Sequence, residues 1–207
     1  YEIVPVVERR ILELCQKYNK LCIVATQMLG SMVEQPEPTR AEVNDVATAA
    51  MLGADATMLS DESAAGKYPV EAVTVMDTTS RYTQSHPEFY TPYERHGSDA
   101  EHESVAVAAV KLAADTSADA IMTVDKTLEL AQNLANQKAN FVNLAVLPTE
   151  RLANRASLLS FTRSFIGTDA RQVLDELKSN NFFGKDAPRV VVIVKQADTY
   201  QMKLVEL

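Results

Sequence analysis

Short apolar runs alternate with helical stretches along the whole chain, and no other feature constrains the fold as much. In the first 85 residues, the runs LCIVAT (21–26) and ATMLS (56–60) have the length and composition of buried strands. Apolar periodicity and capping signals predict helices at 6–18, from Thr39 to about 52, and at 69–82. Strands that alternate with helices form a parallel sheet with helices on both faces. We therefore predict an α/β fold in which both strands are buried.

A second alternation follows a stretch without periodicity. Residues 86–101 contain Pro, Gly and several aromatic residues, which is typical of a linker or hinge. Beyond them, helices are predicted at 104–115, 127–137, 149–159 and 169–181, and strands at 118–124, 141–147, 160–167, 189–194 and 200–207. The last two strands are only a few residues apart, which favours a hairpin. Residues 102–207 are thus expected to form a compact three-layer domain, with a mostly parallel sheet and one antiparallel edge strand.

The composition excludes several classes of function. The net charge is −8 and the pI is about 4.9, and no basic stripe is present, so binding to nucleic acid is disfavoured. No apolar run approaches the roughly 18 residues of a membrane span. Cys15 and Cys22 lack metal-ligand spacing, so we predict inert buried thiols in a reduced, cytoplasmic compartment. The three histidines, at 86, 96 and 102, are expected to be surface or packing residues. A chain that begins with Tyr1 also leads us to expect that an upstream part has been removed.

Polar side chains follow both strands of the first segment. Thr26 ends the first apolar run, and Ser60, Asp61 and Glu62 follow the second. Because the carboxyl ends of parallel strands meet at one edge of a sheet, these groups are placed where ligands bind. Hydroxyls and a carboxylate there can bind an oxyanion or hold a catalytic water. Strands also commonly end in Ser or Thr as simple caps, so both interpretations stay open.

The stretch that contains these residues resembles a known family. Residues 25–73, ATQMLGSMVEQPEPTRAEVNDVATAAMLGADATMLSDESAAGKYPVEAV, are similar to the end of the catalytic barrel of pyruvate kinases. The family reads ATQML-S-M, then P-PTRAEV-DVA, then GAD--MLS-E-A-G-YP-EAV, in the same order and nearly without gaps. The resemblance implies that residues 1–85 are strands seven and eight of a (β/α)8 barrel, and residues 102–207 the C-terminal domain. Two strands cannot close a barrel of eight. We therefore expect the two strands to have unpaired edges. We also expect residues 1–85 either to be poorly ordered or to pack against another chain.

The resemblance also implies an activity. A pyruvate kinase transfers phosphate from phosphoenolpyruvate to ADP, with Mg²⁺ and K⁺ as cofactors. The ligands of both ions lie in a part of the family that this chain lacks, so we expect no metal site here and no catalysis by these residues alone. The parent would be a cytoplasmic homo-oligomer, most simply a tetramer. The alternative is a non-catalytic regulatory or assembly protein derived from the same fold.

Residue roles follow from the matched motifs. Thr26 resembles the substrate-binding threonine, and Ser60 and Glu62 the catalytic pair, which lies in a water network near the carbon that is protonated. Arg40 and Glu42 resemble residues at a subunit contact or active-site edge, although Glu42 equally suits a helix capping box with Thr39.

One position in this stretch departs from the family. Asp61 stands where the family usually has Gly, which suggests a backbone with positive φ. Its added charge is expected to raise the pKa of Glu62.

The second domain departs further. Many family members bind a sugar-phosphate activator on a Gly-bearing loop there. Lys126 and Thr127 keep part of this loop and are weak effector candidates, but the Gly is missing and Asp125 would repel a phosphate. We favour the interpretation that Lys126 and Thr127 only open a helix. The family's glycine-rich loop between the last two strands is also reduced to KQADT here. We predict no conventional fructose-bisphosphate site.

Overall fold

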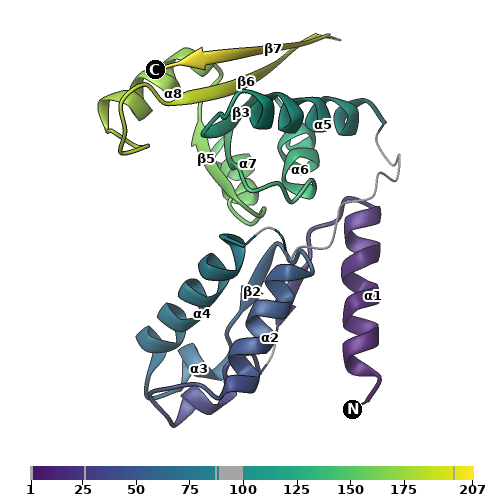
Figure 1. Cartoon of the computed structure of the whole chain (residues 1–207), viewed down its shortest axis with the longest axis vertical. Coiled ribbons are helices and arrows are strands. Elements are labelled where there is room, and N and C mark those ends of the chain that lie inside the picture. The colour runs from purple at the N-terminus through teal and green to yellow at the C-terminus, as the bar shows by residue number, and fades with distance from the viewer. Residues whose placement is uncertain (1, 26, 87, 89–99, 198) are drawn as a thin grey trace. The chain divides into compact units, whose positions relative to one another are not determined.

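The computed structural model describes residues 2–25, 27–86, 88, 100–197 and 199–207 of the 207-residue chain. It separates into two compact units, Tyr1–Arg95 and His96–Leu207 (Figure 1). Most of the predicted linker at 86–101 lies outside the described residues, and so does His96.

The first unit begins with helix α1 (Val4–Lys17) and alternates as the sequence predicts. Strand β1 (Ile23–Ala25) is followed by the 3-10 helix η1 (Gly30–Val33) and helix α2 (Arg40–Met51), and strand β2 (Ala56–Met58) by helices α3 (Asp61–Ala64) and α4 (Pro69–Gln84). The two strands pair in parallel, with Ile23 opposite Ala56 and Ala25 opposite Met58. The predicted parallel arrangement is confirmed, while α3 and η1 were not foreseen.

Local signals explain where the helices of this unit begin and end. Thr39 and Glu42 form the predicted capping box: the Glu42 N–H donates to the Thr39 hydroxyl at 3.3 Å, and the Thr39 N–H donates to the Glu42 carboxylate at 2.7 Å. Gly53 follows α2 with a φ of 84°, a left-handed conformation that favours glycine. Pro69 opens α4, where its missing N–H would have no helical partner.

The buried core of the first unit lies between η1, α2 and α4, and the strands contribute only the partly buried Val24. Its buried residues are Met28, Leu29, Met32, Val46, Ala49, Ala72 and Met76. The prediction of two buried strands is wrong, because Ile23 is 42% exposed and Met58 45% exposed. Among the described residues, β1 and β2 pair only with each other, so their outer edges are unpaired and part of their side chains is uncovered.

Helix α1 also leaves its apolar stripe in solvent. In the sequence, the apolar stripe of this helix consists of Val7, Ile11, Leu14 and Cys15. None of the four is buried, and Val7 and Ile11 are 47% and 49% exposed. Cys15 and Cys22 are likewise only half-buried, which corrects the expectation of buried thiols, and neither forms a disulfide among the described residues. Amphipathic periodicity indicates a helix face that can pack against another element, but few of the described residues pack against this face of α1.

The second unit is a five-stranded sheet with helices on both faces (Figure 1). Its elements are α5 (Ala100–Asp115), β3 (Ala120–Val124), α6 (Glu129–Asn136), β4 (Val142–Leu147), α7 (Glu150–Ala156), β5 (Thr162–Ile166), α8 (Ala170–Ser179), β6 (Arg189–Gln196) and β7 (Thr199–Glu206). The strand order is β5-β4-β3-β6-β7, with β7 antiparallel to β6 and the other pairs parallel. The predicted hairpin and antiparallel edge strand are confirmed.

Side-chain alternation along the central strands builds two cores. Met122 and Val192 belong to the core under α8, and Ile121 and Val191 belong to the core under α5 and α6. This gives the predicted three-layer domain. Within the sheet, β4 and β5 follow one another on one side of β3, and β6 then lies on the other side of β3. The strand order therefore reverses between β3 and β6, and parallel sheets bind ligands outside the carboxyl ends of such strands.

None of the described helices combines the length and apolarity that crossing a bilayer requires.

Candidate functional site

A buried carboxylate joins the ends of β1 and β2. Glu62 is 2% exposed, and one of its oxygens accepts the Leu29 N–H at 3.0 Å while the other accepts the Ser60 N–H at 2.8 Å. Leu29 lies in the segment after β1, and Ser60 follows β2. One side chain therefore holds the segments that follow both parallel strands. We call this arrangement of Glu62, Leu29 and Ser60 the strand-end clamp.

The clamp keeps Glu62 ionised. Burial raises the pKa of Glu62, but the N–H groups of Glu62, Ser60 and Leu29 outweigh it, so the pKa lies below its usual value. The nearby charge that opposes ionisation is Glu42. The expectation that Asp61 raises the pKa of Glu62 is therefore wrong: the carboxylate is held by backbone donors, and its net shift is downward.

Asp61 itself needs no special backbone. It is the first residue of α3, it is exposed, and it is not among the described residues with positive φ. An acidic side chain is well tolerated in the first turn of a helix. The glycine that this turn does need is Gly66, because a Cβ there would lie 2.6 Å from the backbone oxygen of Glu62.

A second carboxylate, that of Glu42, fixes the loop after β1. It accepts the Ser31 N–H and the Ser31 hydroxyl, both at 2.6 Å, in addition to the Thr39 N–H of the capping box. Burial raises the pKa of Glu42, but the hydrogen bonds from Ser31 and Thr39 together lower it by more, so the pKa lies below its usual value. Glu42 is thus tied to η1 and to the start of α2. Arg40 is exposed and has no polar partner within the described part of the chain.

The hydroxyl of Ser60 is the group that remains available at this edge. Ser60 uses its N–H on Glu62 and its C=O on the N–H groups of Ser63 and Ala64, while its hydroxyl has no hydrogen-bond partner among the described residues. Such a hydroxyl can donate to an oxyanion or to a water. Thr26, the predicted substrate-binding residue, lies outside the described residues. Of the predicted site residues, the structure therefore brings Ser60 and Glu62 together and leaves Arg40 apart.

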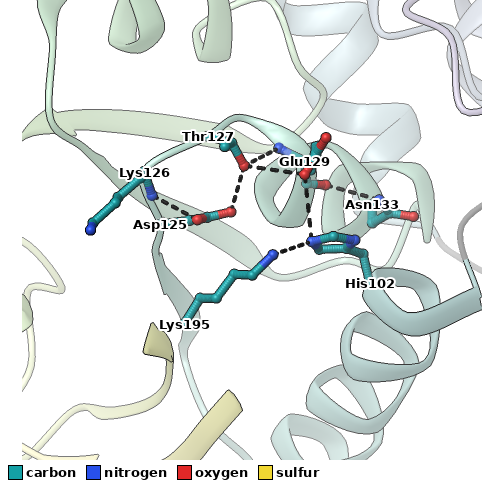
Figure 2. A network of polar contacts seen from close by, with 7 residues as sticks. All are labelled: His102, Asp125, Lys126, Thr127, Glu129, Asn133 and Lys195. Carbon is teal, nitrogen blue, oxygen red and sulfur yellow. Dashed lines mark hydrogen bonds and ion pairs between the residues drawn. The ribbon is translucent and has the colours of Figure 1, made fainter. Parts of the chain in front are cut away.

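The second unit holds a polar network at the carboxyl ends of β3 and β6 (Figure 2). Asp125 follows β3 and accepts the Lys126 N–H at 2.6 Å and the Thr127 hydroxyl at 2.8 Å. The side chain of Lys126 points away from the network in Figure 2. The two predicted effector candidates thus act differently, since Thr127 uses its hydroxyl inside the protein and Lys126 only its backbone.

Lys195 of β6 approaches this network from the neighbouring strand. Its ammonium lies 3.1 Å from Nε2 of His102 on α5, which in turn lies 3.6 Å from the Glu129 carboxylate of α6. The ammonium also lies 5.4 Å from the ring centre of Tyr200, its cross-strand neighbour. Tyr200 contributes most to raising the pKa of Lys195, with further contributions from the charges of Asp125 and Glu129. His102 is 8% exposed, which agrees with the prediction of a packing histidine.

No group of three or more His, Cys, Asp or Glu side chains that could hold a metal ion occurs among the residues that the structure describes. Glu42 and Glu62 direct their oxygens at N–H and hydroxyl donors and do not form an open site. These residues do not fit the role of Mg²⁺ or K⁺ ligands, and we assign none to them.

The fold and the strand-end clamp define a chain that joins a barrel-type β/α segment to a three-layer α/β domain. Residues 1–73 match the family described as "Pyruvate kinase, barrel domain". A pyruvate kinase of Clostridium acetobutylicum is 36% identical over 160 residues, which cover 75% of this chain and 33% of that protein. "Pyruvate kinase 2" of Synechocystis is 33% identical over 198 residues, which cover 92% of this chain and 33% of the relative. The chain belongs to the pyruvate kinase family.

The solved structures agree on the fold. A crystal structure of a pyruvate kinase from Cryptosporidium parvum matches 99% of this chain and 43% of that one, with a TM-score of 0.85 at 24% sequence identity. The chain spans about a third of the length of the curated relatives that it matches. Residues 1–73 therefore account for a barrel portion only, as a two-stranded sheet requires.

Some functional contacts were missed in the sequence. Nothing in the run ATQML marks Leu29 as the partner of Glu62, because the contact uses a backbone N–H. The pairing of His102 with Lys195 joins residues 93 positions apart and carries no local signal. A signal for the Asp125 contacts was present, since Asp and Thr two residues apart before a helix often form such local hydrogen bonds.

Proposed function

We propose that this chain acts as part of a pyruvate kinase that transfers phosphate from phosphoenolpyruvate to ADP. The support is the strand-end clamp: a buried, ionised Glu62 holds the segments that follow two parallel strands, within residues that match the family's barrel. In this proposal Glu62 positions the edge, and Ser60 and Thr26 contact the substrate or a water. Arg40 and Glu42 lie at the active-site edge or at a subunit contact.

The chemistry of these residues is supporting. Mg²⁺ and K⁺, bound by residues outside this chain, would neutralise the charge of the phosphoryl group. The Ser60 hydroxyl would donate to an oxyanion or orient a water, while its own N–H is fixed by Glu62. Both Glu62 oxygens accept backbone N–H groups, so the role we assign to Glu62 is positioning and not proton donation. The 207 residues alone are proposed to be inactive, because two strands provide one part of a barrel edge.

The remaining assignments are also proposals. The protein would act as a cytoplasmic homo-oligomer, most simply a tetramer. The outer edge of β7, which pairs with no other described strand, and the exposed Leu204 offer surfaces for such contacts. The alternative is a non-catalytic regulatory or assembly protein of the same fold. Its support is Asp125, whose carboxylate occupies the loop where relatives with an activator would need a phosphate-binding site.

A coupled pyruvate-release assay tests the proposal. A chimera that joins the preceding barrel portion of the C. acetobutylicum relative to this chain is expected to release pyruvate from phosphoenolpyruvate and ADP with Mg²⁺ and K⁺. The 207-residue chain alone is expected to release none. Ser60→Ala in the chimera should lower kcat, while Ser63→Ala, three residues away and with an exposed side chain, should not. A folded chimera without activity would support the non-catalytic alternative.

A further inference from the structure

A buried histidine connects helix α5 with two other elements of the second unit. His102 is 8% exposed, and its Nε2 atom lies 3.1 Å from the Lys195 ammonium of β6 and 3.6 Å from the Glu129 carboxylate of α6 (Figure 2). The same nitrogen therefore lies between a cation and an anion, which come from different elements. Whether it carries a proton decides which of the two it can bind.

The contact with Lys195 requires a neutral imidazole. An ammonium has three N–H donors and no acceptor, so a nitrogen at hydrogen-bond distance from it must be the acceptor. Tyr200 contributes most to raising the pKa of Lys195. The charges of Asp125 and Glu129 raise it further, so the ammonium persists at neutral pH. Nε2 of His102 thus accepts an N–H of Lys195, and the proton of the ring is on Nδ1.

Protonation of the ring reverses this preference. A proton on Nε2 occupies the lone pair that accepts from Lys195 and places a second positive charge 3.1 Å from the ammonium. Like charges at that separation repel, and they do so most where little water screens them. The Glu129 carboxylate, 3.6 Å from Nε2, is then a suitable acceptor for the new N–H. One proton thus exchanges the partner of His102 from a cation on β6 to an anion on α6.

The groups around His102 come from each element that packs against it. Tyr200 of β7 meets the ring edge-on, with ring centres 5.8 Å apart, and burial raises its pKa, so it stays a neutral phenol. The charged groups that face or flank the ring are Lys195 of β6, Glu129 of α6, Asp125 before α6, and Glu101 and Glu103 on α5 itself. Among these side-chain types, imidazole is the one whose charge changes between about pH 5 and 8.

We propose that His102 is a pH-dependent switch that exchanges its partner between Lys195 and Glu129. Neutral His102 connects α5 to the hairpin of β6 and β7 through Lys195. Protonated His102 pairs with Glu129 of α6, and the Lys195 ammonium is released. Acidification therefore weakens the attachment of the hairpin to α5. The proposal concerns the second unit alone and does not depend on the catalytic role of the chain.

Nitrogen NMR of the ¹⁵N-labelled 207-residue chain tests both states. At about pH 8, the ring signals of His102 should show a proton on Nδ1 and none on Nε2. Between about pH 8 and 5.5, the Lys195 and Tyr200 amide signals should shift with the same midpoint as the ring. The protection of the hairpin amides against hydrogen exchange should fall by about tenfold over this range, since the loss of one hydrogen bond from a charged group has an effect of this size.

His102→Gln separates the switch from other effects of acid. The Gln oxygen can accept from Lys195 but does not titrate, so the shifts of the Lys195 and Tyr200 amides and the loss of hairpin protection should disappear. His86→Gln is the matched control, because it makes the same change at a histidine of the first unit and should leave both effects intact.

Lys195→Met gives a second test, which also serves if His102→Gln does not fold. With no ammonium to displace, acidification should no longer lower the protection of the hairpin. Lys203→Met is the control for this variant, because Lys203 lies on the same hairpin, opposite Val192, with an exposed side chain. It should keep the full acid-induced loss.

Three results would overturn the proposal. A proton on Nε2 at about pH 8 would mean that His102 does not accept from Lys195. A ring that stays neutral down to about pH 5.5, or that titrates without any change at Lys195 and Tyr200, would mean that it does not control the hairpin. Acid-induced effects of unchanged size in a folded His102→Gln or Lys195→Met variant would assign them to another group.

Discussion

Replacing Glu62 with Gln tests the strand-end clamp with the smallest change in shape. The amide side chain has nearly the same size, but it has one acceptor oxygen where the carboxylate has two. Its NH₂ group must then face either the Leu29 N–H or the Ser60 N–H, both of which donate to Glu62 in the wild type. Two donors cannot satisfy each other, so one buried N–H is left without a partner.

The magnitude follows from these contacts. A hydrogen bond to a charged group contributes about 1.5–3 kcal/mol, and a buried donor without an acceptor costs about 1–3 kcal/mol. Two effects act in the opposite direction, since the neutral side chain avoids the burial cost of a charge and the repulsion from Glu42. We expect the local opening free energy of the strand ends to fall by about 2–4 kcal/mol.

Native-state amide hydrogen exchange is the suitable assay, because it reports on the two N–H groups of the clamp individually. The protection of the Leu29 and Ser60 amides should fall by about 30- to 1,000-fold, since 1.36 kcal/mol corresponds to a factor of ten. Asp61→Asn is the matched control: it makes the same acid-to-amide change one residue away, on an exposed side chain, and should alter protection less than about threefold.

The reasoning fails if Glu62→Gln leaves the protection of both amides within about threefold of the wild type. In that case other contacts hold the strand ends, and Glu62 does not stabilise them. It also fails if Asp61→Asn has an effect as large as that of Glu62→Gln, because loss of charge anywhere in the turn would then suffice.

Three further predictions follow from the described contacts. Gly66→Ala should destabilise the first unit by about 2–4 kcal/mol in urea titrations, since its Cβ would meet backbone 2.6 Å away, whereas Gly30→Ala, whose Cβ would lie 3.8 Å from Glu42, should cost less than about 1 kcal/mol. The pKa values of Glu42 and Glu62 are depressed by folding, so their stabilisation should be complete above their ordinary value of 4.5 and be lost as the pH falls through the lower folded values. Circular dichroism between pH 3 and about 7 should show this acid limb, and a Glu42→Gln, Glu62→Gln double variant should flatten it. Asp119→Asn should cost about 1–2 kcal/mol in the second unit, because Asp119 contacts Lys185 at 2.6 Å and accepts the Arg189 N–H at 2.9 Å, while Asp115→Asn, in an exposed pair with Lys111, should change stability by less than about 0.5 kcal/mol.

The predictions from sequence succeeded where structure follows from local periodicity and failed where it depends on a partner. Apolar runs located β3, β4 and β6, which are buried on both faces by the helices of the same unit. Equally apolar runs gave β1 and β2, yet Ile23 and Met58 are partly exposed because little in the described chain covers them. The same limit applies to α1, because none of the residues of its apolar stripe is buried by the described chain.

Interpretation of the acidic turn at residues 60–63 shows a similar division. The motif placed Ser60 and Glu62 at the end of a strand, and the structure agrees. The expected strain and charge effects at Asp61 did not follow, because these residues start a short helix in which an Asp is acceptable and Glu62 turns inward. A residue type in a motif does not specify the direction of its side chain, which depends on the donors around it.

The sequence by itself determined the alternation of strands and helices, the parallel sheets, the terminal hairpin and the Thr39–Glu42 capping box. Each of these depends on spacing within a few residues, or on an apolar pattern that does not require a particular packing partner. Tertiary structure decided that Glu62 reaches Leu29, 33 positions away, and that Lys195 meets His102 across 93 positions. Such contacts exist only once the ends of separate elements converge, and a buried charge is then stable only where the converging backbone supplies donors for it.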